Sequence, residues 1–382
     1  MISAPPATSF PGCVPSLVDP ATGVVLRAHT EQDLSAIVEQ CNDPQVRRWT
    51  TVPLPAGGYR LDDARDFAQS VVPQGWEEHT CSTWVVDAER PGPDGSPLRQ
   101  YCGAVDLRFK GDGSAEVGFA LHPGARGRGV MSSAVRLVVD YGLTVERLTA
   151  IRWLAERGNW PSRRVAAAVG FSFDGSVRRL LPHRGELKDA WVATIVAGDP
   201  RRPDRRWLQA PTLSGHQVRL RDWRHGDAAR VAEACADHRT RHWLVSLPQP
   251  YSESDAHDWI ELTREAAAAG HAFNWCIADP ADDRCLGSVS LEGFGGYARR
   301  AEIGYWAHPG ARGRGVVTEA VRLVTEFAEE SVADSIVIRV ADGNTASRHV
   351  AEAAGYHYIG ALPASEPLGD GTLADLLSFS RP

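Results

Sequence analysis

A glycine-rich stretch that occurs twice places the strongest constraint on the fold of this chain. The stretch His-Pro-Gly-Ala-Arg-Gly-Arg-Gly-Val runs from His122 to Val130 and again from His308 to Val316. Each copy follows a strand-like run and precedes a helix-like run, which predicts a turn that opens a helix. Glycines let successive backbone N–H groups converge, and a helix start adds unpaired donors and a positive dipole end. The repeat therefore predicts two anion sites, each suited to a phosphate group.

The duplication extends well beyond the two turns. Downstream of the turns, Asn159 and Ser162 match Asn344 and Ser347, and each copy then closes on a glycine followed by an aromatic residue. Strand-like and helix-like segments alternate within each half. This order predicts an α/β (α+β) module that is repeated once, and 382 residues leave room for two such domains.

The composition along the chain predicts four segments. Residues 1–22, rich in Pro and Ser, are expected to form a mobile N-terminal tail, and residues 23–199 the first domain. Residues 200–214 are loaded with Pro and Arg and are expected to be the linker to the second domain, residues 215–382.

Charge, hydropathy and cysteine content narrow the class of protein. The formal net charge of −7 gives no general attraction to nucleic acid, and no apolar run reaches the roughly 20 residues that a membrane span needs. The cysteines are scattered, without a Cys-x-x-Cys pair or a histidine cluster at metal-ligand spacing. We therefore expect a cytoplasmic protein with reduced thiols, no metal and no membrane partner.

The order of strand, glycine turn, helix, strand, Asn-x-x-Ser helix and Gly-aromatic pair resembles the GNAT superfamily of acyl-CoA-dependent N-acyltransferases. The Asn-x-x-Ser element and the tryptophan before the second helix are most similar to the RimJ/RimL-type branch, which acetylates protein N-terminal amines. The resemblance covers nearly the whole chain. It implies two tandem GNAT modules, each with a mixed, mostly antiparallel, splayed sheet flanked by helices.

The resemblance implies an acyl-CoA donor, with acetyl-CoA as the leading candidate. In the family, the backbone amides of the turn hold the coenzyme A pyrophosphate, and the pantetheine arm runs along the fourth strand. The positions implied are Ala120, Leu121, His122, Arg126, Gly127, Arg128, Gly129, Val130, Met131 and Asn159 in the first copy, and Trp306, Ala307, His308, Arg312, Gly313, Arg314, Gly315, Val316, Val317 and Asn344 in the second. The family pattern ends in Gly or Ala where this chain has Met131 and Val317. A larger side chain there could crowd the phosphate, whereas backbone donation does not depend on the side chain.

Glu116 and Glu302 occupy matching places in the strands before the turns. They resemble the glutamate that relatives use as a general base, directly or through water, to take a proton from the attacking ammonium. The alternative is that each strand carboxylate pairs with a neighbouring arginine.

Ser162 and Ser347 are the expected proton donors to the leaving thiolate. Many relatives use a tyrosine at the positions of Ala166 and Ala351 here, and in RimL-like members the serine takes this role. A hydroxyl beside sulfur can donate a proton or orient a water. The alternative is that Asn-x-x-Ser caps the helix start, and both roles are compatible if the asparagine caps while the serine faces sulfur.

Trp49 and Trp243 also occupy matching positions. They are candidates for the wall of an acceptor pocket, with core packing as the alternative. His122 and His308 each precede a proline at a strand end, which favours a role in shaping the loop over one in proton transfer.

The function expected from these features is transfer of an acyl group from coenzyme A to a primary amine of a small molecule or peptide. Acetyl is the leading candidate for the acyl group. One alternative is an aminoacyl-tRNA donor, which the net charge disfavours although a local arginine patch could compensate. Another is a non-catalytic acyl-CoA sensor or scaffold. The covalent tandem could form an internal pseudo-dimer, and a monomer or a homodimer is compatible with the sequence.

Overall fold

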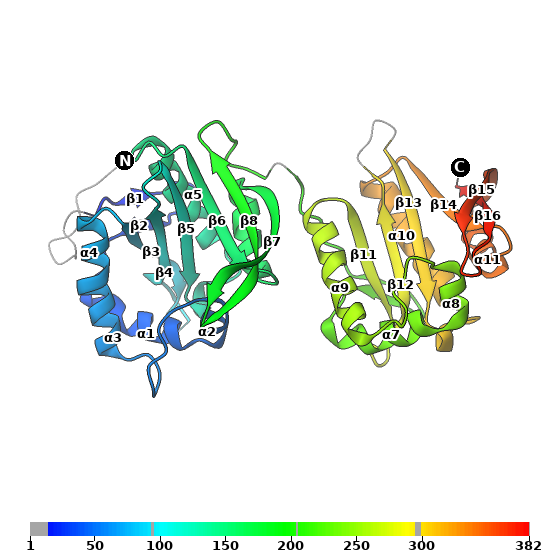
Figure 1. The fold of residues 1–382 in the computed structure, drawn as a ribbon, viewed down its shortest axis with the longest axis horizontal. Helices are drawn as coiled ribbons and strands as arrows, with labels where there is room; N and C mark the ends of the chain where they lie inside the picture. Colours follow the sequence, from blue (N-terminus) through cyan, green and yellow to red (C-terminus); the bar gives the residue numbers. More distant parts are fainter. Residues whose placement is uncertain (1–13, 93–94, 204, 295–298, 382) are drawn as a thin grey trace. The chain divides into compact units, whose positions relative to one another are not determined.

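The computed structural model describes residues 14–92, 95–203, 205–294 and 299–381. It divides the chain into two compact units, Met1–Asp204 and Arg205–Pro382, here called unit 1 and unit 2. Figure 1 shows that each unit has its own sheet with helices packed against it. Among the described residues, no helix combines the length and apolar character needed to cross a bilayer.

Unit 1 is built on an 8-stranded sheet with the order β1-β2-β3-β4-β5-β6-β8-β7, in which only the β5–β6 pair is parallel among the described strands. Its strands are β1 (Leu17–Val18), β2 (Val25–Arg27), β3 (Cys81–Pro91), β4 (Pro97–Phe109), β5 (Ser114–Leu121), β6 (Ala150–Glu156), β7 (Ser172–His183) and β8 (Glu186–Val196). Its helices are α1 (Leu34–Asn42), α2 (Pro44–Trp49), α3 (Leu61–Asp66), α4 (Val72–Glu77), α5 (Val130–Thr144) and α6 (Trp160–Val169), with a π turn at Phe67–Val71 and 3-10 turns at Glu31–Asp33 and Pro123–Ala125.

Unit 2 repeats this plan, with the sheet order β15-β16-β14-β13-β12-β11-β10-β9 and one parallel pair, β13–β14, among the described strands. Its strands are β9 (Leu213–Ser214), β10 (Arg219–Arg221), β11 (Ala272–Ala278), β12 (Cys285–Glu292), β13 (Arg300–Ala307), β14 (Ser335–Ala341), β15 (His357–Pro367) and β16 (Leu373–Ser380). Its helices are α7 (Ala228–Ala236), α8 (His238–Trp243), α9 (Glu253–Ala268), α10 (Val316–Ser331) and α11 (Thr345–Ala353), with 3-10 turns at His225–Asp227 and Pro309–Ala311. The predicted pair of GNAT-like modules is confirmed.

Helices cover both faces of each sheet. In unit 1, the buried Trp84 and Val86 of β3 share one core with α5 and α6, while Val85 between them shares another with α1 and α3. This alternation follows from the two-residue period of a strand. The sheet therefore has a face towards α5 and α6 and a face towards α1 and α3, which we call the α5 face and the α1 face. The corresponding faces of unit 2 pack on α10 with α11 and on α7 with α9.

The parallel strands separate before they end. Pairing of β5 with β6 stops at Val117 and Trp153, although β5 continues to Leu121 and β6 to Glu156. Pairing of β13 with β14 stops at Glu302 and Val337 in the same way. Each sheet therefore has a gap in its middle, beside the glycine-rich turn.

The predicted tail is wrong for residues 14–22, while residues 1–13 lie outside the described part of the chain. Leu17 and Val18 pair with β2, Val14 is fully buried, and the Trp84 indole donates to the Pro15 carbonyl at 3.0 Å. Proline and serine content describes local backbone preference, but it does not reveal that a short edge strand is paired.

The predicted linker is likewise wrong for residues 205–214. Leu208 is buried, Leu213 pairs with β10, and the Trp275 indole donates to the Pro211 carbonyl at 2.8 Å. The first copy makes the matching contacts, namely pairing of Leu17 with β2 and the bond from Trp84 to Pro15. The segment that contains the first strand therefore belongs to the fold of its unit.

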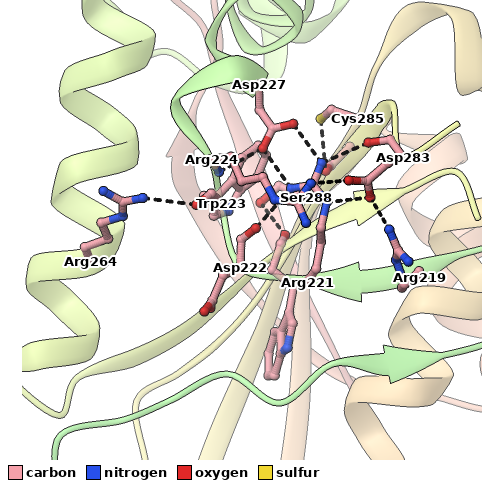
Figure 2. Close-up of polar contacts among 12 residues, drawn as sticks. Arg219, Arg221, Asp222, Trp223, Arg224, Asp227, Arg264, Asp283, Cys285 and Ser288 are labelled. Carbon is pink, nitrogen blue, oxygen red and sulfur yellow. Dashed lines mark hydrogen bonds and ion pairs between the residues drawn. The ribbon is translucent and has the colours of Figure 1, made fainter. Parts of the chain in front are cut away.

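An arginine, buried in unit 2 and half-buried in unit 1, joins the sheet to the first helix of each unit. In unit 2, Arg221 donates to both oxygens of Asp227 at 2.8 and 2.9 Å, and its Nε donates to Asp283 at 2.8 Å (Figure 2). In unit 1, Arg27 makes two 2.8 Å bonds to Asp33. Each arginine also bonds a second aspartate, Asp87 for Arg27 at 2.7 Å and Asp283 for Arg221, so loss of Asp33 or Asp227 removes one of two compensating charges. These pairs fix the helical layer of the α1 face.

We expect Asp33→Asn to lower the free energy of unfolding of unit 1 by about 3 kcal/mol at pH 7, because it breaks a buried ion pair. Burial alone would raise the pKa of Asp33, but the bonds and charge of Arg27 outweigh it and lower that pKa. The stabilisation is therefore full above the unfolded-state pKa of about 3.9 and disappears as the pH falls through the lower folded-state pKa.

Urea unfolding followed by tryptophan fluorescence from pH 7 down to acid measures this difference. The control is Asp62→Asn, whose carboxylate is 96% exposed beside Arg65 and should change stability by less than about 0.5 kcal/mol. Equal effects of the two substitutions, or no convergence at low pH, would contradict the role assigned to Asp33.

Candidate active site

His122 and His308 shape the start of each glycine-rich turn. The Nδ1 atom of His122 accepts the Gly124 N–H at 3.1 Å, and its Nε2 lies 3.1 Å from a Glu39 carboxylate oxygen. His308 makes the same two contacts, to Gly310 and Glu233. An Nδ1 that accepts cannot carry a proton, so each ring is the neutral tautomer with hydrogen on Nε2, and burial lowers the pKa of both histidines. The predicted role in shaping the loop is confirmed.

The glycines of the turns adopt a conformation that other residues avoid. Gly127 and Gly129 have φ of 74° and 75°, and Gly313 and Gly315 have φ of 72° and 78°. Gly129 and Gly315 are the N-caps from which α5 and α10 begin. The helix bond that spans the start of α5 runs from the Ser133 N–H to the Gly129 carbonyl at 3.2 Å. The amides that precede Ser133 in the helix have no intrahelical acceptor, which makes this end an anion site.

The first arginine of each turn and the second residue of each helix have their side chains held elsewhere. Arg126 bonds Asp43, and Arg312 bonds Asp237 at 2.6 Å, so each first arginine anchors the turn to the N-cap of α2 or α8. Met131 is only 3% exposed and belongs to the core on the α5 face, and Val317 is buried in the same way in unit 2. The larger side chains that replace the family's Gly or Ala therefore lie in the core rather than over the helix start.

One edge of β5 faces the gap. Its far edge pairs with β4 as far as Gly103 and Leu121, and the His122 N–H donates to the Cys102 carbonyl at 2.8 Å. Beyond Val117, no pairing with β6 occurs on the other edge among the described residues. The strand segment predicted to meet pantetheine, Ala120–His122, thus presents backbone groups to the gap. Residues 306–308 of unit 2 have the same position on β13.

The asparagines cap their helices while the serine hydroxyls make other contacts. The Asn159 side-chain oxygen accepts the Ser162 N–H at 3.3 Å, and Asn344 accepts the Ser347 N–H at 3.1 Å. The Ser162 hydroxyl accepts the Trp153 indole N–H at 3.0 Å. Because Trp153 is the last β6 residue paired with β5, Ser162 lies beside the place where the gap opens, and its own proton remains free to donate.

Unit 2 surrounds its serine differently. The Ser347 hydroxyl donates to the Tyr305 hydroxyl at 3.0 Å, and Tyr305 donates to the Ser347 carbonyl at 3.0 Å. Burial raises the pKa of Tyr305 to about 12, so this hydroxyl stays protonated. Strand register places Phe119 at the position of Tyr305 in unit 1. The two copies thus share the serine but differ in its partner.

Both predicted catalytic glutamates are ion-paired. Glu116 contacts Arg108 at 2.9 Å and Lys110 at 3.0 Å, and Glu302 accepts from Arg339 Nε at 2.8 Å. This is the alternative that the sequence left open for them. The two ion pairs hold the Glu116 carboxylate against Arg108 and Lys110.

The sequence did not single out Asp106, which lies two residues nearer the gap along β4 than Arg108, the partner of Glu116. Asp106 of β4 is paired in register with Gly118 of β5, and its side chain is 20% exposed and 2.9 Å from Arg108. Burial raises the pKa of Asp106 above its ordinary value, and the opposing charge of Arg108 does not cancel the shift. A Cβ on Gly118 would lie 2.7 Å from the Asp106 carboxylate, so only glycine leaves room there. In unit 2 the same row holds Ser290, and Glu292 takes the place of Arg108.

Trp49 and Trp243 are half-buried beside the Asn-x-x-Ser elements, not in the core. A Cβ on Gly158 would lie 3.7 Å from the Trp49 ring, and one on Gly343 would lie 3.9 Å from Trp243. Arg48 stacks on Trp49 at 4.2 Å.

Residues far apart in the sequence contact one another beside Trp49 in unit 1. Arg48 binds the buried Glu156 at 2.8 and 3.1 Å, and His183 lies 3.9 Å from the same carboxylate. Arg184 donates to the carbonyls of Arg47, Thr50 and Val52. The β7–β8 hairpin is therefore fastened to the end of α2. The second copy has no Glu at the matching position, so the repeat gave no signal for this contact.

The comparisons with known proteins agree with this architecture. The model of the acetyltransferase (GNAT) domain matches residues 24–172 and 217–357. The chain therefore belongs to the GNAT acetyltransferase family and carries the domain twice.

Three similar proteins illustrate the relationship. "Uncharacterized N-acetyltransferase p20" of Bacillus licheniformis is 24% identical over 173 residues, covering 45% of this chain and 92% of its own length. "Putative ribosomal N-acetyltransferase YdaF" of Bacillus subtilis (strain 168) is 31% identical over 140 residues, covering 34% of this chain and 72% of its own. The solved structure of Mycobacterium smegmatis RimJ in complex with CoA-disulfide is 21% identical, covers 48% of this chain and 86% of its own, and has a TM-score of 0.40.

We expect Gly129→Ala to destabilise unit 1 by about 1 to 2 kcal/mol, because alanine pays that cost in the left-handed conformation. No atom lies within 4 Å of the added Cβ, so the effect isolates backbone strain. The control is Gly198→Ala, which also meets no atom within 4 Å and has no positive φ. Urea unfolding measures both, and a Gly129→Ala variant as stable as Gly198→Ala would disprove the strained turn.

Proposed function

We propose that unit 1 transfers an acetyl group from acetyl-CoA to a primary amine, with the thioester held in the gap between β5 and β6. The observation that carries this proposal is the placement of a half-buried carboxylate of raised pKa and a hydroxyl with a free proton on opposite faces of that gap. Asp106 belongs to the α1 face of the sheet, and Ser162 belongs to α6 on the α5 face.

The residues of the turn fit the coenzyme. The diphosphate is assigned to the backbone amides from Arg126 to Met131, where the glycines and the helix start provide donors without a side chain in the way. The pantetheine arm is assigned to the free edge of β5 at Ala120–His122, and Asn159 holds the start of α6 against the gap. An oxyanion at the thioester carbonyl would be stabilised by an N–H of this strand segment.

The amine is assigned to the α1 face. As its nitrogen attacks the thioester carbonyl, the C–N bond forms, the C–S bond breaks, and the proton of the attacking nitrogen passes to Asp106. A raised pKa suits a carboxylate for this step, because a base must hold the proton it receives. Glu116 keeps Arg108 and Lys110 in place beside it.

The leaving thiolate receives its proton from Ser162. The Trp153 indole donates to the serine oxygen and so orients the hydroxyl proton away from the indole. The products are the amide and the free thiol of coenzyme A, and Ser162 recovers its proton from solvent.

We expect Asp106→Asn to lower kcat by about 100-fold or more while the KM for acetyl-CoA changes little, because the variant loses the base but keeps the turn. In the wild-type protein kcat should rise with pH through the raised pKa of Asp106, since the ionised form is the base, and the variant should lose this rise. Free thiol release from acetyl-CoA, measured with peptides beginning in Ser, Ala or Met and with small amines, gives both quantities.

The control is Asp140→Asn on α5, whose exposed carboxylate pairs with Arg201 away from the gap. A wild-type pH profile in Asp106→Asn would place the base elsewhere. Acetyl-CoA binding without thiol release for any amine would favour the sensor instead. Binding of aminoacyl-tRNA that weakens steeply with salt would favour the tRNA-dependent alternative.

A further inference from the structure

One row of side chains on the α1 face differs sharply between the two units. In unit 1 the row pairs Val85 with Ala104 and Ala104 with Ala120. In unit 2 the matching row pairs Cys276 with Ser288 and Ser288 with Trp306. In-register neighbours point to the same face of a sheet, so position 120 or 306 presents its side chain to the face on which we place the acceptor. Unit 1 has a methyl group there and unit 2 an indole.

The indole of Trp306 completes a cluster of three tryptophans over the row. Its ring centre lies 6.2 Å from that of Trp223 and 6.2 Å from that of Trp259, and Trp223 and Trp259 meet edge to face at 4.9 Å. Trp223 is held between Arg221 and Arg224, which bind Asp227 and Asp283 (Figure 2). Beneath this cluster Ser288 is only 4% exposed. The acceptor side of unit 2 is thus filled by its own side chains.

Unit 1 has smaller side chains at the positions that match this cluster. The counterparts of the cluster are His29, Phe67 and Ala120, with only the His29–Phe67 contact at 5.6 Å. Ala104 and Ala120 both remain partly exposed, although alanine is among the easiest residues to bury. The helix above also differs, because the π turn Phe67–Val71 interrupts α3 and α4, whereas α9 is regular throughout. The π turn and the small side chains thus distinguish this face of unit 1 from the tryptophan-covered face of unit 2.

His29 adds a polar group to the open side. Its side chain is fully buried, and neither ring nitrogen has a hydrogen-bond partner in the described part of the chain. Burial lowers the pKa of His29 to about 4, so the ring is neutral and offers one donor and one acceptor. Trp223, its counterpart, instead belongs to an aromatic cluster. Both residues leave a buried ring nitrogen without a hydrogen-bond partner among the described residues, so the two units differ here in aromatic packing rather than in hydrogen bonding.

We infer that the two units have different tasks: unit 1 receives the amine acceptor over Ala104 and Ala120, whereas in unit 2 Trp306 fills the acceptor side and leaves an acyl-CoA site without access for an acceptor. This inference rests on the proposed function for its chemistry. Unit 2 keeps both glycines of the turn and the buried Val317, so nothing in this difference removes its donor site.

The accessibility of the row can be measured without knowing the acceptor. In the full chain, Ala104→Cys and Ser288→Cys place a thiol at matching positions, and N-ethylmaleimide labelling followed by peptide mass spectrometry gives each rate. We expect Ala104→Cys to react at least about tenfold faster, because a covered thiol reacts only after local opening. Buried Cys102 and Cys235, which lie outside this row, report any general loss of structure in the same digest. Adding Trp306→Ala should raise labelling of Ser288→Cys towards the Ala104→Cys rate.

Reciprocal substitutions test the consequence for transfer. Ala120→Trp should lower thiol release from acetyl-CoA with the amine panel by about 100-fold, because the indole displaces the acceptor from its attacking position. Trp306→Ala should not restore transfer in a chain that already carries Ala120→Trp, because unit 2 has Ser290 at the position of Asp106. Thermal unfolding and acetyl-CoA binding by calorimetry verify that each variant is folded and retains its donor sites.

The outcomes separate this inference from the proposed function. Equal labelling of the two cysteines, or full transfer by Ala120→Trp, overturns the division between the units. Thiol release absent from the wild-type chain, together with the expected labelling pattern, contradicts the proposed transfer but supports the difference in access.

Discussion

The separation of two parallel strands is the constraint on which the rest of each unit depends. Strands β5 and β6 are paired over only the residues Ser114–Val117 and Ala150–Trp153, and beyond them each strand continues without the other. Backbone groups left without a partner inside a sheet are costly unless water or a ligand satisfies them. The turn that begins α5 lies at the end of one strand, and Asn159 begins α6 after the other. The gap and its two helix starts therefore lie together, which suits the long, thin donor with a charged end that we propose.

This geometry also explains why the proposed acid and the proposed base come from different layers. A ligand within the plane of the sheet can be reached from both faces, so Ser162 and Asp106 need not compete for the same space. A buried carboxylate next to a serine would lose free energy through desolvation and would also bind the hydroxyl proton. The sheet between them keeps the two proton transfers apart, and Arg108 balances the charge of Asp106 without reaching the other face.

The repeat made the general architecture predictable from the sequence, but it directed attention to what the copies share. The turn, the paired asparagines and serines, and the number of modules could all be predicted from residues that are identical in the two copies. Asp106 could not, because a single aspartate in a strand has no signature and its counterpart is Ser290. The contact of Arg48 with Glu156 joins residues far apart in the sequence, which no local pattern reports. The paired state of residues 14–18 was missed for the same reason.

Shared and divergent residues therefore carry different information in a duplicated chain. Both copies retain what the donor needs, namely positive φ at two glycines and a helix start free of side chains, because backbone donors tolerate little change in geometry. The residues that differ, Ala120 against Trp306 and Phe119 against Tyr305, lie on β5 and β13 and point to opposite faces of the sheet. Substitution has thus altered both approaches to the gap while preserving the gap itself. A fold that separates donor binding from acceptor access allows one copy to lose access without losing its structure, since Trp306 contributes aromatic packing where Ala120 leaves an opening.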